Sequence, residues 1–202
     1  MPDVLVYALH HDGAINKNSL GAVSEAARAA SELGGEAHAV LLGGEDLTDE
    51  LCASLGRYGA TKVFRVEGPE GLAQPVVDAM AKVIADHGHD YALFGGGLLG
   101  FEIGAVVAEH LRMPSLTQVI QMDVSAGTLR CERQAEYGYD TVLVELPAVI
   151  SVGDAINEPR YPSLKAIMGA KKKPLDTKSA ADAGIEPARV GYDNARAHCA
   201  DF

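Results

Sequence analysis

The chain has 202 residues, 48% of them hydrophobic, so it is long enough to bury a substantial core within one domain. Its formal net charge of −11 argues against nucleic acid as a partner, because phosphate binding needs a basic face. The widely spaced Cys52, Cys131 and Cys199 predict no disulfide framework, and no leader-like or membrane-length apolar run is evident, so we expect a cytoplasmic protein without membrane insertion.

The first half of the chain alternates apolar runs with amphipathic stretches. The first run, Val4–Leu9, has no polar alternation, which is typical of a strand buried on both faces of a parallel sheet. Strands that alternate with helices form right-handed βαβ units, so the predicted fold class is α/β, with a doubly wound, Rossmann-like parallel sheet over residues 1–113. Further strands are expected at 37–42, 62–66 and 91–94, each preceded by a helix with one apolar face, and a fourth helix is expected over 103–111.

The pattern changes after Pro114. From there, short turn sequences separate apolar stretches with no helical pattern between them, which predicts a β extension of the same domain over 114–153. Its strands are expected at 116–124, 128–136, 141–146 and 148–152. Residues 154–176 are expected to form a loop and a short helix. From Thr177 the sequence is polar and weakly periodic, so 177–202 is expected to be a C-terminal arm.

Glycines cluster after the strand expected at 91–94. Ligands of open α/β sheets bind beyond the carboxyl ends of the strands. Gly95, Gly96, Gly97 and Gly100 would leave backbone N–H groups free at the start of a helix, which is a ready site for a phosphate. The pattern is neither a Walker A sequence nor a clean Gly-x-Gly-x-x-Gly. The same glycines could instead serve only to let the helix pack closely on the sheet, and both interpretations stay open.

The stretch 149–174, VISVGDAINEPRYPSLKAIMGAKKKP, carries the most specific pattern in the chain. After the strand, Pro159 and Pro162 exclude a helix and predict an extended or turned loop. Ser163 is a candidate N-cap for a short helix with an apolar face and lysines near its C-terminus. Residues 160–178 hold six basic side chains and one acidic one. This basic patch favours docking to an acidic partner, although an ordinary solvated helix end would look the same.

The order of the short motifs in this stretch resembles the C-terminal part of the electron transfer flavoprotein beta subunit. The resemblance implies that residues 154–176 form a partner-recognition loop and helix, which dock onto a flavin-dependent dehydrogenase through an anchoring leucine matched here by Leu164. The alternative is a loop that only caps the domain, with Leu164 in the core. The resemblance assigns the rest of the docking surface to the loop residues Asn157, Glu158, Pro159, Arg160 and Tyr161 and to the helix residues Ile167 and Met168.

The resemblance also implies a heterodimer with an electron transfer flavoprotein alpha subunit, which holds most of the FAD while the beta subunit covers one side of it. Beta subunits usually carry a longer acidic loop that cradles AMP. The shorter Gly95–Glu102 stands in its place and lacks the aspartates, so AMP, a different nucleotide and an empty pocket are all alternatives here. Expected cofactor contacts come from the loops that leave the strands: Ala8, Leu9, His11, Asp12, Leu42, Gly43, Gly95, Gly96, Gly97 and Gly100.

The resulting hypothesis is an electron carrier subunit that does no bond-making chemistry of its own. Two other classes stay open. One is a stand-alone nucleotide-binding module of the stress-protein type, which would homodimerise with ATP or AMP and without flavin. The other is a bifurcating flavoprotein whose beta subunit holds its own FAD and accepts hydride from NADH, although the short glycine loop argues against it because a further dinucleotide needs more contacts. The pairs His10-His11 and His87-x-His89 suggest a metal, but no third ligand with suitable spacing is evident.

Overall fold

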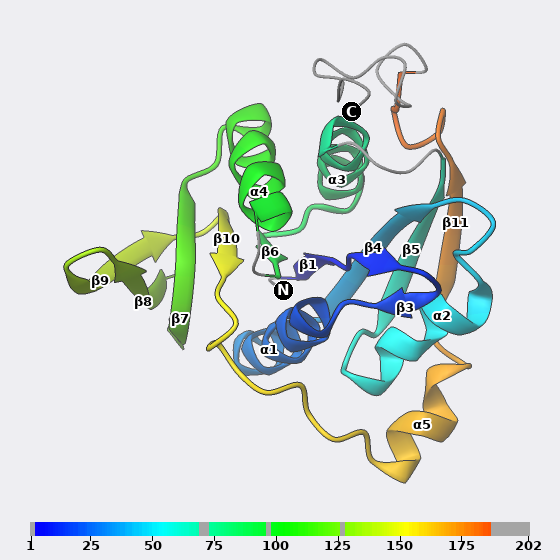
Figure 1. Ribbon diagram of the computed structural model, residues 1–202, viewed down its shortest axis with the longest axis horizontal. Helices are drawn as coiled ribbons and strands as arrows, with labels where there is room; N and C mark the ends of the chain where they lie inside the picture. Colours follow the sequence, from blue (N-terminus) through cyan, green and yellow to red (C-terminus); the bar gives the residue numbers. More distant parts are fainter. Residues whose placement is uncertain (1–2, 69–72, 96–97, 126–127, 187–202) are drawn as a thin grey trace, which may run out of the picture.

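The computed structural model describes residues 3–68, 73–95, 98–125 and 128–186 (Figure 1). These residues form one nine-stranded sheet, whose strands in chain order are β1 (Val4–Tyr7), β4 (Ala37–Gly43), β5 (Lys62–Glu67), β6 (Tyr91–Phe94), β7 (Ser115–Ser125), β8 (Thr128–Ala135), β9 (Gly138–Glu145), β10 (Ala148–Val152) and β11 (Leu175–Ser179). In space their order is β11-β5-β4-β1-β6-β10-β7-β8-β9. Neighbours from β11 to β7 are parallel, and β8 is antiparallel to both β7 and β9. The expected α/β fold with a doubly wound parallel sheet is confirmed.

Helices cover both faces of this sheet (Figure 1): α1 (Lys17–Leu33), α2 (Asp49–Ser54) and the 3₁₀ turn η1 (Leu55–Arg57) on one face, and α3 (Ala73–His87) and α4 (Leu98–Leu111) on the other. Two cores result, because successive side chains of a strand point to opposite faces. On β1, Val4 and Val6 belong to the core beneath α1, while Leu5 and Tyr7 belong to the core beneath α3 and α4. No helix in these described ranges is long and apolar enough to cross a bilayer.

The ends of α1 follow from two residues. The side chain of Asn16 accepts a hydrogen bond from the N–H of Asn18 (2.9 Å), so Asn16 is the N-cap of the helix. The hydroxyl of Ser19 accepts a hydrogen bond from the N–H of Leu9, two residues after β1 (3.0 Å). At the other end Gly34 has a φ of 73°, the left-handed conformation that stops a helix.

The β7–β9 extension has some apolar side chains buried in the core and others exposed. Leu129, Cys131 and Val144 are buried in the core on the α1 face. On the same hairpin, Tyr139 and Leu143 are 70% and 69% exposed. The extension therefore completes one core and leaves apolar side chains exposed beside it.

A short two-stranded ribbon follows β1. It consists of β2 (His10–His11) and β3 (Ala14–Ile15), which pair antiparallel. Its turn, Asp12-Gly13, has φ angles of 49° and 69°. Two successive residues with positive φ give the tight hairpin turn whose twist matches its strands.

The chain after α5 (Leu164–Ala170) also differs from the expectation. The boundary expected at 176 falls inside β11, which adds to the edge of the sheet in parallel with β5. Beyond it, Ala183 and Ile185 are buried in the core beneath α3. This part of the expected arm therefore belongs to the domain. Residues 187–202 lie outside the described residues.

Candidate functional site

The carboxyl ends of β1, β4 and β6 meet at one edge of the sheet, which is where open α/β folds bind ligands. Tyr7 of β1 lies opposite Val40 of β4 on one side and Phe94 of β6 on the other. The chain leaves β1 through α1 to reach β4, and β6 lies on the opposite side of β1, so the strand order reverses between β1 and β6. The predicted contact residues at or just beyond these strand ends are Ala8, Leu9, Leu42, Gly43 and Gly95.

Gly95 lies against the first turn of α1. A Cβ at this position would be 3.0 Å from the carbonyl carbon of Asn18 and from the backbone nitrogen of Ser19. Close packing therefore accounts for the glycine at 95, as the second interpretation of the glycine cluster proposed, and a phosphate contact there stays a prediction. Of the other loop glycines, Gly96 and Gly97 lie outside the described residues and Gly100 lies in the first turn of α4.

Gly95→Ala should lower the free energy of unfolding by about 1–3 kcal/mol, because the added methyl group meets backbone atoms that cannot rotate away. Gly44→Ala is the matched control. Gly44 is exposed after β4, and a Cβ there would have nothing within 4 Å, so the change should stay within about 0.5 kcal/mol. Urea denaturation of both variants measures the difference, and equal stabilities would contradict the close approach of Gly95 to α1.

The loop that follows β10 lies along α1. The Nδ2 of Asn157 donates to Oε2 of Glu25 (3.2 Å), and the N–H of Arg160 donates to Oγ of Ser24 (3.4 Å). A Cβ on Gly21 would be 3.2 Å from Oδ1 of Asn157, so the loop touches the helix where the helix has no side chain. The expected extended loop is therefore fixed to the domain by side chains far away in the sequence.

The helix α5 begins as predicted. The Oγ of Ser163 accepts the N–H of Ala166 (3.2 Å), which is an N-cap. The helix packs on η1 through Ala170, which is 2% exposed and whose Cα would be 3.2 Å from a Cβ on Gly56. At its end, Nζ of Lys171 lies 3.6 Å from a carboxylate oxygen of Glu50 on α2.

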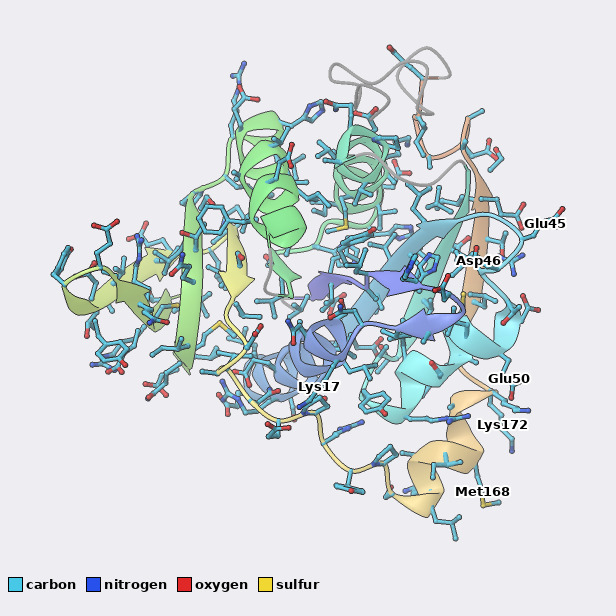
Figure 2. The ribbon with its side chains drawn as sticks, in the orientation of Figure 1. Lys17, Glu45, Asp46, Glu50, Met168 and Lys172 are labelled. Atoms are coloured by element: carbon cyan, nitrogen blue, oxygen red, sulfur yellow. The ribbon has the colours of Figure 1, made fainter. Side chains whose placement is uncertain are left out.

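The outer side of this segment is apolar. Leu164 is 74% exposed, so the alternative that places it in the core is wrong. Its neighbours Tyr161, Met168 and Ile167 are 99%, 69% and 41% exposed. Figure 2 shows Met168 on the side of α5 that is turned away from the sheet. The structure thus gathers the predicted docking residues on one peripheral loop and helix.

Residues 4–183 match the family model of the electron transfer flavoprotein domain. The chain belongs to this family. It is 42% identical over 97 residues to proteins named electron transfer flavoprotein subunit beta from Mycobacterium bovis and Mycobacterium tuberculosis, and as similar to that of Mycobacterium leprae. The matched stretch covers 48% of this chain and 36% of each relative's length. The chain therefore carries an electron transfer flavoprotein domain, and about half of it is similar to part of proteins named subunit beta.

The two histidines of the ribbon after β1 lie in different environments. His11 and Asp12 lie at the tip, and their side chains are 88% exposed and 3.3 Å apart. His10 is buried, and its Nε2 lies 2.9 Å from the carbonyl oxygen of Leu42, which can only accept, so this nitrogen donates. Its Nδ1 lies 3.4 Å from a carboxylate oxygen of Asp46. His10 therefore ties the ribbon to the end of β4, a role that the sequence analysis missed.

A cavity of about 310 Å³ lies between the first turn of α1 and the loop that follows β10. Its lining includes Lys17, Asn18, Asp154 and Asn157. Figure 2 shows Lys17 at the N-terminal end of α1 beside this loop, and its Nζ lies 3.2 Å from a carboxylate oxygen of Glu158. The Oδ1 of Asn157 is buried and accepts no hydrogen bond from the described part of the chain. Sequence reasoning did not find this cavity, because its two walls are more than 130 residues apart in the chain.

The two cysteines in the described part of the chain, Cys52 and Cys131, are both buried. Burial raises the pKa of Cys52 and of Cys131 to about 11, so both stay protonated at neutral pH and are poor nucleophiles. No group of three or more metal-ligating side chains is arranged to hold a metal ion within residues 3–68, 73–95, 98–125 and 128–186. What the described site offers is binding surfaces.

Proposed function

We propose that this protein is the beta-like subunit of an electron carrier. It pairs with an alpha subunit, helps to enclose FAD held mainly by that subunit, and docks onto a flavin-dependent dehydrogenase that supplies the electrons. The observation that carries the proposal is the exposed apolar group of Tyr161, Leu164 and Met168 on a segment that is otherwise fixed to the domain. Large apolar side chains on a firmly held surface suit a partner's pocket.

The expected dehydrogenase surface is an apolar pocket with an acidic rim. Around Leu164 the side chains of Arg160, Lys165, Lys172 and Lys173 are exposed, whereas the protein as a whole carries a net charge of −11. Opposite charges across an interface raise the association rate, and the apolar anchor supplies most of the affinity. This division suits a carrier, which must find its donor quickly and leave it again.

A second exposed surface suits the alpha subunit. On the β8–β9 hairpin, Tyr137, Tyr139 and Leu143 are 83%, 70% and 69% exposed, and β9 is an edge of the nine-stranded sheet. Apolar side chains on an edge strand invite pairing with another chain, so a permanent partner is expected to cover them. We assign FAD to the space between the two subunits, with AMP, where bound, at the loop glycines. The proposed contacts of this chain are those at the carboxyl edge of the sheet: Ala8, Leu9, His11, Asp12, Leu42, Gly43 and Gly95.

Co-expression of the chain with an electron transfer flavoprotein alpha subunit tests the proposal. We expect a yellow heterodimer that releases FAD on denaturation and whose flavin is bleached by a flavin dehydrogenase with its substrate. Size-exclusion chromatography, the absorption spectrum and the nucleotide content after denaturation measure these properties. A colourless homodimer that carries ATP or AMP would contradict the carrier function and favour the stand-alone nucleotide-binding module.

A further inference from the structure

Glu25 is a buried carboxylate on α1 that joins two other parts of the chain. It is 5% exposed. Its oxygens accept hydrogen bonds from Nε of Arg28 (3.0 and 3.2 Å) and from Nδ2 of Asn157 (3.2 Å). Arg28 also donates to the backbone oxygen of Met122 on β7 (2.5 Å), and its hydrogen bonds to Glu25 raise the pKa of the guanidinium. One carboxylate thus connects α1, β7 and the loop after β10.

The loop contacts the domain at two positions, Asn157 and Arg160, before the chain reaches Leu164. At Asn157 it lies on Gly21, and at Arg160 its N–H donates to Ser24. The guanidinium of Arg160 lies over Gly59, where a Cβ would be 3.2 Å from Nη2. A segment without regular secondary structure therefore has a defined conformation. Ile156 packs against the core, and the hydrogen bond from Asn157 connects the loop to the buried carboxylate of Glu25.

We infer that Glu25 is a positioning residue for docking. Through Asn157 it holds residues 157–160 in the conformation that presents Tyr161 and Leu164, and through Arg28 it fixes that conformation relative to β7. The inference rests on the proposed function, since it assumes that this segment docks. A loop that is ordered before binding loses less conformational freedom on association. Releasing it should weaken the encounter with the dehydrogenase and leave electron transfer within the formed complex unchanged.

Asn157→Asp in the assembled heterodimer tests the inference. The change keeps the shape of the side chain but replaces the amide donor with a second carboxylate facing Glu25, and like charges at this distance repel. We expect the KM for a flavin dehydrogenase to rise about tenfold with kcat unchanged. Amide hydrogen exchange at residues 156–161 should become faster. Asn157→Ala, which removes the donor without adding charge, should shift both quantities in the same direction by less.

Adding Glu25→Gln to Asn157→Asp provides the rescue. The glutamine amide can donate to the new carboxylate at position 157, so the double variant should recover both the KM and the slow exchange. Ser163→Asp adds the same charge to the same segment while keeping the N-cap, and it should leave exchange at 156–161 unchanged.

The outcomes separate this inference from the proposed function. Unchanged KM and exchange in Asn157→Asp, or a double variant without recovery, overturns the positioning role. If Leu164→Ala raises the KM and Asn157→Asp does not, only the role of Glu25 is wrong. If Leu164→Ala leaves the KM unchanged, docking through this segment is itself wrong, and the inference falls with it.

Discussion

Leu164→Ala should raise the KM of a flavin dehydrogenase for the assembled flavoprotein about thirtyfold and change the free energy of unfolding by less than about 0.5 kcal/mol. Leu164 is 74% exposed on a capped helix, so shortening it opens no cavity. An apolar anchor in a partner's pocket contributes about 2 kcal/mol or more, and each 1.4 kcal/mol is a factor of ten. Steady-state flavin reduction at varied flavoprotein concentration measures the KM, and urea denaturation measures the stability.

Leu55→Ala is the control that shows what a core leucine does. Leu55 in η1 is 0% exposed, so its truncation should cost about 2–5 kcal/mol. The two variants remove the same atoms from opposite environments. A Leu164 variant that loses as much stability as the Leu55 variant, or that is reduced with an unchanged KM, would show that the exposed leucine is no docking anchor.

The parallel core could be predicted because burial on both faces leaves a signature in the sequence. The run Val4–Leu9 has no polar alternation, and β1 (Val4–Tyr7) is buried throughout, with neighbouring residues in different cores. The run 37–42 likewise became β4 (Ala37–Gly43), whose residues are buried except for His38. A continuous apolar run of this kind is stable only when both of its faces are buried, so the sequence pattern and the structure agree.

The edge elements could not be predicted in the same way. The strand β11 reads Leu-Asp-Thr-Lys-Ser and pairs with β5 alone, so it needs no apolar run and looked like the start of a polar arm. The ribbon after β1 was also missed. Its signal was present in Asp12-Gly13, a dipeptide that favours the positive φ angles of a tight hairpin.

Residues 154–164 illustrate what local sequence patterns do not encode. The sequence motif indicated Leu164, and Pro159 indicated a loop without helix. The exposure of the Leu164 side chain and the conformation of the loop, however, depend on contacts with distant parts of the chain. Glu25 looks like any acid on an amphipathic helix, and Asn157 is 132 positions away from it. The hydrogen bond between them forms because the loop after β10 passes along α1, and no local sequence pattern encodes that path.

The free energy of unfolding should fall by about 2–3 kcal/mol between pH 7.5 and pH 4.5 because one histidine binds a proton more readily in the unfolded chain than in the folded protein. His89, just before β6, is 3% exposed. Burial, and after it the charges of His38 and His87, lowers the pKa of His89 from 6.5 to about 4. Its Nε2 lies 3.0 Å from Nδ1 of His38. Lys62 acts in the same direction, and only Asp3 opposes the shift.

The direction follows from proton binding. Above pH 6.5 the imidazole of His89 is neutral in the folded and the unfolded protein, so its contribution is constant. Between pH 6.5 and about 4 the unfolded chain binds a proton that the folded protein does not, and stability falls as the pH falls. Below about pH 4 both states are protonated, and the contribution stops changing.

His89→Gln isolates this contribution, because glutamine can still hydrogen-bond to His38 but takes up no proton. The loss of stability between pH 7.5 and pH 4.5 should be about 2–3 kcal/mol smaller in the variant than in the parent protein. His110→Gln, at an exposed position near the end of α4, should keep the parent's pH dependence. Carboxylates titrate in the same range, so the quantity to compare is the difference between variant and parent in urea denaturation at each pH. A His89 variant with the parent's slope would mean that acid destabilises the protein through other groups.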